Sequence, residues 1–197
     1  MRRLVLLLVV GMACPVLADD PAVPGENLFP LKVGSVWTYK VSGQDERFTV
    51  KAVRQEMIGE QTCMLMEATL KDRVVASEHL AFTKQGLCRF RADKEDVDPP
   101  LCVLRVPAPR KGWKAEYHLG PRQASASFFT TSADVTVPSG KYKTTAVHAT
   151  VSEGPTSAVT TSIWYAEGVG MVKQEIRDGR PRPLVLELEK FEKGGEK

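Results

Sequence analysis

Apolar and polar residues alternate along most of the chain after residue 28. Trp37, Tyr39 and Val41, for example, are separated by Thr38 and Lys40. A period of two places successive side chains on opposite faces of a β-strand, so we expect one face of each segment to be buried. No 3.6-residue apolar period persists for three helical turns. The segments with strand character are 37–41, 48–52, 64–70, 74–83, 87–91, 101–106, 113–119, 124–137, 142–151, 158–165, 171–177 and 184–191.

Turn-forming residues separate these segments and favour hairpins between neighbours. Val137-Pro138-Ser139-Gly140 places Pro and Gly at the second and fourth positions of a type I turn. About eleven strands are too many for a flat open sheet, because twist accumulates and edges stay unpaired. The pattern predicts an all-β fold, a curved antiparallel meander of about eleven strands forming a barrel, a half-barrel or a two-sheet sandwich. Segment 184–191 also suits a helix, because it is rich in Leu, Glu and Lys.

The first eighteen residues have the pattern of a secretory signal peptide. Arg2 and Arg3 precede an apolar run, and small residues ending at Ala18 precede an acidic pair. We expect export and cleavage after Ala18. The alternative is lipidation of Cys14, which follows an alanine as in a bacterial lipobox, although Gly11 stands where that motif has a branched apolar residue. The apolar run is too short to span a bilayer, and no later segment is long enough, so no transmembrane helix is expected.

Composition fits one exported globular domain. The expected parts are a signal peptide (1–18), a flexible tether (19–27), a single β-rich domain (28–193) and a tail (194–197). The chain has 197 residues, of which 43% are hydrophobic and 26% charged, as is typical of globular proteins. Removal of the two leader arginines leaves 25 basic and 24 acidic residues, so we expect no affinity for nucleic acid.

Three cysteines, Cys63, Cys88 and Cys102, follow the leader, which is an odd number for an oxidising compartment. The alternation of apolar residues places Cys88 and Cys102 on the same face of two strands, and it predicts that residues 92–100 form the loop of the hairpin between them. We predict a Cys88–Cys102 disulfide; the alternative is three buried free thiols. No Cys-x-x-Cys pair is present, so neither a thioredoxin-like site nor a zinc ribbon is predicted.

Residues with catalytic or metal-binding chemistry are scattered. His79, His118 and His148 lie on separate predicted strands without the spacing of metal ligands, so we expect no metal and no cofactor. His148 is expected to face solvent. Glu67 and Glu78 lie within apolar segments, where a buried carboxylate can be catalytic, but the pattern alone places neither inward. No nucleophile or phosphate-loop motif is present, and no catalytic residue is predicted.

Basic and aromatic residues interleave between positions 105 and 122. The set consists of Arg105, Arg110, Lys111, Trp113, Lys114, Tyr117 and Arg122. Such a mixture can bind nucleic acid or acidic glycans. The balanced charge of the exported chain favours a solvated loop beside a core tryptophan instead.

Methionine and aromatic side chains are abundant on the expected inner faces. Flexible Met side chains and an incompletely closed barrel suit a pocket for an apolar ligand, although a packed core uses the same residues. The candidate ligand-binding residues are Met64, Met66, Phe82, Phe128 and Trp164, and we expect Trp37, Met57 and Phe129 to face inward with them.

Three phrases, at 29–39, 137–144 and 164–173, resemble those of a group of exported bacterial β-rich proteins. In that group an FPLxxGxxWxY opening is followed by VPxGxYxT and WYAxGVGxVK. The resemblance implies an envelope or secreted protein with a curved antiparallel sheet, distantly similar to the lipoprotein-carrier half-barrels that hold acyl chains. It implies no activity and no catalytic residue.

Three functions are compatible with these patterns. The leading hypothesis is a non-enzymatic exported protein that binds an apolar or amphipathic small molecule or lipid in the concavity of its sheet. The second is a structural or protein-interaction module of the envelope with a filled core. The third is a hydrolase with dispersed catalytic residues. An accessible apolar cavity would favour the first, and converging histidines would favour the third.

Overall fold

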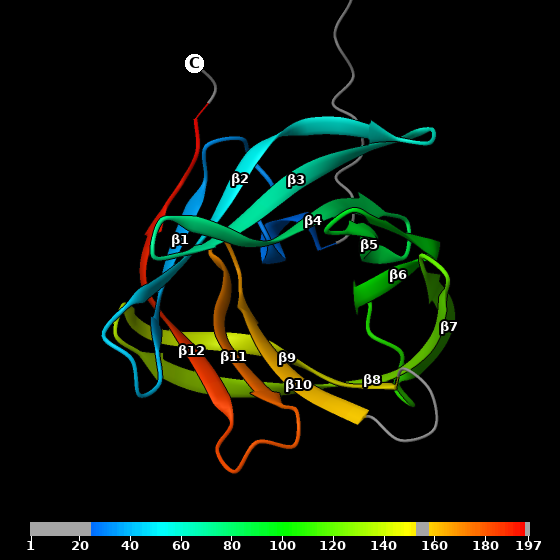
Figure 1. The fold of residues 1–197 in the computed structure, drawn as a ribbon. Coiled ribbons are helices and arrows are strands. Elements are labelled where there is room, and N and C mark those ends of the chain that lie inside the picture. The colour runs from blue at the N-terminus through cyan, green and yellow to red at the C-terminus, as the bar shows by residue number, and fades with distance from the viewer. Residues whose placement is uncertain (1–24, 153–157, 196–197) are drawn as a thin grey trace, which may run out of the picture.

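A computed structural model describes residues 25–152 and 158–195 as a closed antiparallel β-barrel (Figure 1). A short 3-10 helix, η1 (Glu26–Leu28), precedes the strands. Each strand pairs with its neighbours in sequence, and pairing of the first strand with the last closes the barrel. The strands are β1 (Val36–Val41), β2 (Arg47–Ile58), β3 (Gln61–Leu70), β4 (Arg73–Thr83), β5 (Gly86–Ala92), β6 (Glu95–Arg105), β7 (Trp113–Leu119), β8 (Arg122–Val137), β9 (Gly140–Ser152), β10 (Ala158–Ala166), β11 (Gly170–Arg177) and β12 (Leu184–Glu192).

The barrel confirms the predicted all-β fold and selects one of the three predicted architectures. Segment 184–191, whose composition also suited a helix, forms β12 and closes the barrel by pairing with β1. Tyr39 lies opposite Leu188, and Val41 lies opposite Leu186. All four side chains are buried. Burying the alternating face of β12 against β1 therefore outweighs the helical propensity of its composition.

The expected loop at 92–100 is wrong. Strand β5 continues to Ala92 and β6 begins at Glu95, so the turn contains only Asp93 and Lys94. Asp93 has a positive φ of 52°, which Asp tolerates better than most residues, and its carboxylate accepts a hydrogen bond from the Ser77 backbone N–H at 2.8 Å. Proline is tolerated later in β6 because pairing with β7 is limited to two residue pairs, so few ladder hydrogen bonds need the missing N–H.

Aromatic side chains fill the end of the barrel nearest η1. Trp37 is fully buried and stacks between Phe29 and Phe191, with ring centroids 5.1 Å away on each side. Its indole N–H donates to the Val169 carbonyl at 2.6 Å, so the polar edge of the ring is satisfied. The same end is tied to η1 through the Gly168 N–H, which donates to the Asn27 carbonyl at 2.6 Å.

The predicted disulfide joins Cys88 of β5 to Cys102 of β6, which lie directly opposite each other. Cross-linking this short loop stabilises the fold by about 3 kcal/mol on the chain-entropy model. Cys63 is the free cysteine among the described residues, and it is buried. Burial raises the pKa of the Cys63 thiol to about 11, so this thiol stays protonated and unreactive at neutral pH. Cys14 and the expected cleavage site lie outside the described residues.

Candidate ligand site in the barrel interior

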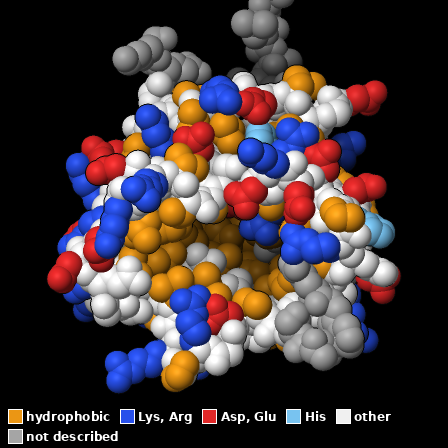
Figure 2. All heavy atoms as spheres, viewed as in Figure 1, with side chains coloured by type: hydrophobic (Ala, Val, Ile, Leu, Met, Phe, Trp, Pro, Cys, Tyr) orange, Lys and Arg blue, Asp and Glu red, His pale blue; other side chains and the backbone are white. Residues whose placement is uncertain are grey.

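The barrel is hollowed at the end that faces the viewer in Figure 2. Figure 2 shows a recess with mainly hydrophobic walls and with acidic and basic side chains along its upper margin. In Figure 1 the same region lies inside the ring of strands, between β1 and β4 above and β9 to β12 below. We call this interior space the lumen.

Strand register identifies the side chains that line the lumen. Directly paired residues share a face of the sheet, so the inward orientation of Trp37 and Tyr39 extends to Val50 and Phe48 on β2 and from there around the barrel. Many inward-facing residues are only partly buried, which a densely packed core would not allow. The partly exposed apolar members of this wall are Phe48, Val50, Ala115, Leu119, Val151, Ile163, Ile176 and Leu184.

An ion pair lies within this apolar wall. Arg89 of β5 donates to Glu78 of β4, and both Nε and Nη2 lie 2.7 Å from the same carboxylate oxygen, Oε2. Register places Glu78 opposite the buried Met66 and Arg89 opposite the buried Leu80. The two charged side chains nevertheless keep 34% and 33% exposure, as expected for groups that face an open interior.

Two tyrosines from other strands, Tyr165 and Tyr117, lie near Arg89 of this ion pair. The charges of Glu78 and Arg89 both act on Tyr165 of β10, which lies on a distant part of the barrel wall. Burial, with a smaller effect from the Glu78 carboxylate, raises the pKa of Tyr165 well above its ordinary value. Burial, and then Tyr165 itself, likewise raises the pKa of Tyr39. Both phenols therefore stay neutral and able to donate hydrogen bonds, and the Tyr39 hydroxyl already donates to the Met171 carbonyl at 2.8 Å.

The five sequence-predicted ligand residues do not form one group. Met64 and Met66 are buried on the inward face of β3, and Phe82 is partly buried at the end of β4. Phe128 is buried and stacks on Trp113, with ring centroids 4.9 Å apart. Trp164 lies on the outer face, where the Lys173 ammonium is 5.8 Å from its ring centroid.

Two other residues expected to face inward are exposed. Met57 is 60% exposed, because the tip of the β2–β3 hairpin extends past the barrel (Figure 1). Phe129 is 55% exposed, because it follows the inward-facing Phe128 and successive strand residues point to opposite faces.

Phe129, His148 and Trp164 form an outer aromatic ladder across β8, β9 and β10. The Phe129 and His148 rings stack at 4.6 Å, and the His148 and Trp164 rings meet edge to face at 6.2 Å. The His148 ring is hydrogen-bonded to Thr131 at 3.0 Å and to Ser162 at 2.9 Å. His148 is thus on the outer face as expected, but it is half-buried between its neighbours.

A second cavity lies where η1 meets the ends of β3 and β4. Its volume is about 500 Å³, and its lining includes Pro30, Leu31, Met64, Leu80 and Phe82. Two of the predicted ligand residues, Met64 and Phe82, therefore do line a cavity. Polar side chains from η1 and from the C-terminal end of the domain, among them Glu26, Asn27 and Lys193, also line this cavity.

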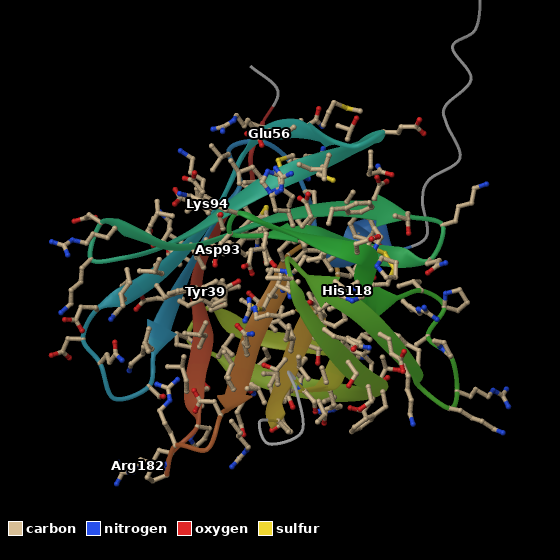
Figure 3. The ribbon with its side chains drawn as sticks, turned by 45° about the vertical axis from the view of Figure 1, so that its right-hand side comes forward. Tyr39, Glu56, Asp93, Lys94, His118 and Arg182 are labelled. Atoms are coloured by element: carbon tan, nitrogen blue, oxygen red, sulfur yellow. A yellow bond between two sulfur atoms is a disulfide. The ribbon has the colours of Figure 1, made fainter. Side chains whose placement is uncertain are left out.

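The remaining candidate residues lie apart from one another. His79 is buried on the outer side of the sheet, and its Nε2 lies 2.8 Å from the Glu56 carboxylate of the β2–β3 hairpin (Figure 3). His118 is exposed on β7, on the face opposite to the buried Tyr117. Within residues 25–152 and 158–195 no group of three or more His, Cys, Asp or Glu side chains could hold a metal ion.

The basic and aromatic residues between 105 and 122 do not form one surface. Trp113 and Tyr117 are buried on the inward face of β7, whereas Lys114 between them is exposed. Arg105 lies over the Trp113 ring at 5.7 Å, and Arg122 pairs with Glu95 at 2.7 Å. Alternation thus places the buried aromatic rings and the exposed lysine on opposite faces of β7, in line with the core tryptophan beside a solvated loop that the sequence favoured.

Fold and lumen together define a small closed β-barrel with an accessible, mainly apolar interior. A family model described as DUF3108-like matches residues 127–181, from β8 to the turn after β11. Two of the three sequence phrases lie in this part of the chain. No curated protein matches. Among the described residues, no helix has the length and apolar character that crossing a membrane requires.

Two solved structures are similar to this chain. One is a candidate lipoprotein from Parabacteroides distasonis, with a TM-score of 0.49 and 11% sequence identity over 88% of this chain and 100% of that chain. The other is a candidate exported protein with a YmcC-like fold from Bacteroides fragilis, with a TM-score of 0.43 and 13% identity over 84% of this chain and 98% of that chain.

Proposed function

We propose that the chain is an exported, non-enzymatic binding protein that holds an apolar or amphipathic ligand in the lumen. The observation that carries the proposal is the partly exposed apolar face inside the barrel, together with the hollow in Figure 2. Apolar surface that remains accessible inside a fold is costly in water and gains free energy when a ligand covers it. The closed barrel also protects its own strand edges, which leaves the interior as the surface suited to a ligand.

Export is supported by the leader sequence and by the disulfide. Disulfides persist in oxidising compartments and are rare in the cytosol. We infer a periplasmic or extracellular location for the barrel. Cleavage after Ala18 would release it, and lipidation of Cys14 would tether it to a membrane through residues 15–27.

The arrangement of the histidines supports binding over hydrolysis. His79 is buried against Glu56, His118 is exposed on β7, and His148 lies in the outer aromatic ladder. A hydrolase needs a nucleophile, a base and an orienting group within hydrogen-bond reach of one another. Cys63 has a raised pKa and is buried, which is unfavourable for a nucleophile.

A protein-interaction role is the second candidate, and the outer aromatic ladder favours it. Phe129 exposes more than half of its surface beside two further aromatic rings. Aromatic residues are enriched where proteins bind one another. This role is compatible with ligand binding, because the ladder and the lumen lie on opposite faces of the same strands.

Filling the lumen is expected to abolish ligand binding. Ala115 is an inward-facing, partly exposed residue of β7 opposite the buried Ala126. Ala115→Trp should reduce the affinity for a fluorescent long-chain fatty acid by about tenfold or more, because the indole would occupy the ligand's space. Fluorescence titration of the full exported protein measures the affinity, and circular dichroism confirms the fold.

The matched control is Lys114→Trp, which adds the same ring one residue away on the exposed outer face. It should bind the fatty acid like the wild type. Ile163→Trp, on another part of the wall, gives a second test if Ala115→Trp does not fold. Unchanged binding by a folded lumen-filling variant would contradict the proposed function, and so would a wild type that binds neither the fatty acid nor any other long-chain amphiphile.

A further inference from the structure

The lumen contains an ion pair where a purely apolar cargo would need none. Glu78 and Arg89 face the interior from adjacent strands, beside the buried apolar side chains of Met66 and Leu80. Placing charged groups in an apolar cavity costs desolvation free energy, which their mutual attraction only partly offsets. A charge pair that remains accessible in such a place can act on the polar end of a ligand.

Each side chain of the ion pair has one polar atom that does not contact its partner. Nε and Nη2 of Arg89 both contact Oε2 of Glu78, at 2.7 Å. This leaves the guanidinium Nη1 and the carboxylate Oε1 outside the contact. Both side chains are about one-third exposed, so a ligand that enters the lumen can reach them. The site therefore offers one cationic donor and one anionic acceptor side by side.

The net charge of the site decides which headgroup fits. Arg89 and Glu78 together are neutral, and the nearby Tyr165 stays protonated. An anionic headgroup on Arg89 would leave one uncompensated negative charge in a low-dielectric interior. A cationic headgroup on Glu78 would leave one positive charge. A headgroup with both charges leaves none, because each ligand charge meets a protein charge of opposite sign.

We infer that the lumen binds a single-chain amphiphile with a zwitterionic headgroup, whose anionic group contacts Arg89 and whose ammonium contacts Glu78. The alkyl chain then lies against the apolar wall that includes Val50, Ile163 and Leu184. The inference rests on the proposed function, because it names the class of ligand for the same site. It makes the ion pair a specificity element rather than a structural one.

The test compares three amphiphiles that share one saturated chain and differ in headgroup charge. They are a lysophosphatidylethanolamine, a lysophosphatidic acid and an alkyltrimethylammonium salt, each titrated below its micelle concentration by isothermal calorimetry. The full exported protein should bind the zwitterionic amphiphile about tenfold more tightly than either charged one. Equal affinities for all three would overturn the inference.

Single charge deletions should reverse the preference in opposite directions. Glu78→Gln leaves Arg89 unpaired and should favour the lysophosphatidic acid. Arg89→Gln leaves Glu78 unpaired and should favour the alkyltrimethylammonium ion. The matched controls are Asp96→Asn and Arg91→Gln, which break the outward-facing Arg91–Asp96 pair at 2.6 Å and should leave the ranking unchanged.

A double variant keeps the test decisive if a single deletion does not fold. Glu78→Gln with Arg89→Gln leaves no unpaired charge, and replacing both partners of a buried pair is far less destabilising than removing one. It should still bind a long-chain alcohol but lose the preference for the zwitterion. If the double variant still preferred the zwitterionic amphiphile, the ion pair would not determine which headgroup binds. Failure of every amphiphile to bind the wild type would instead refute the proposed function itself.

Discussion

Trp37→Ala is expected to lower the free energy of unfolding by about 3–5 kcal/mol. The indole is fully buried, stacks on Phe29 and Phe191, and donates a hydrogen bond to the Val169 carbonyl. Its removal leaves a large cavity where η1, β1, β12 and the β10–β11 turn meet. The Val169 carbonyl also loses its donor in a partly buried site.

Urea denaturation followed by far-ultraviolet circular dichroism measures this loss, since the variant lacks one fluorescent reporter. Trp164→Ala is the control, because Trp164 is a half-buried tryptophan on the outer face. Its loss should cost about 1 kcal/mol, as expected when packing against one side of a ring is removed. An equal loss in the free energy of unfolding for the two substitutions would mean that Trp37 is not packed in the core as described.

Gly86→Ala is expected to cost about 3 kcal/mol or more, or to prevent folding. Gly86 begins β5 with a φ of 122°, in a region that side chains disfavour. A Cβ atom there would lie 2.0 Å from the Leu104 carbonyl oxygen and 2.9 Å from the Arg105 Cα. Both atoms belong to the paired strand β6, so the β5–β6 pairing next to the disulfide would have to open.

Gly168→Ala provides the comparison for Gly86→Ala. Gly168 also has a positive φ, of 74°, but no atom lies within 4 Å of the added Cβ. This substitution should cost only the backbone strain, about 1 kcal/mol. Thermal unfolding of the oxidised proteins measures both effects. A Gly86→Ala protein as stable as Gly168→Ala would show that β5 and β6 are not packed as described.

The sequence pattern predicted the fold well because strand alternation is a local signal. Trp37, Tyr39 and Val41 face inward as their spacing indicated, and the disulfide joins the two cysteines predicted to share a face. The prediction of a loop at 92–100 is wrong because prolines and charged residues are typical of loops but do not require one. A two-residue Asp-Lys turn and a strand with few ladder partners accommodate them instead.

The interior site could not be predicted because the strand pairing that brings Glu78 beside Arg89 is not visible in the sequence pattern. Register shifts occur between His79 and Leu80 on the β4–β5 pairing, and between Leu87 and Cys88 on the β5–β6 pairing. The extra residue of each shift lies on β5 after Arg89 or on β6, so it changes which residues lie opposite one another and not the face of Glu78 or Arg89. Residues on both faces of β4 are buried, so the pattern alone gives Glu78 no orientation and does not distinguish Arg89. Trp164 faces outward, contrary to the prediction, because it alternates with the inward-facing Tyr165 on β10, where the β9–β10 pairing is regular.

The central claim is that the lumen holds one amphiphilic molecule. Native mass spectrometry of the full-length protein, produced with its leader and purified without detergent, tests this most directly. We predict a population heavier than the polypeptide by the mass of one lipid-sized molecule, depleted in Ala115→Trp and retained in Lys114→Trp. A spectrum with only the polypeptide mass, which stays unchanged after incubation with lysophosphatidylethanolamine, would contradict the account.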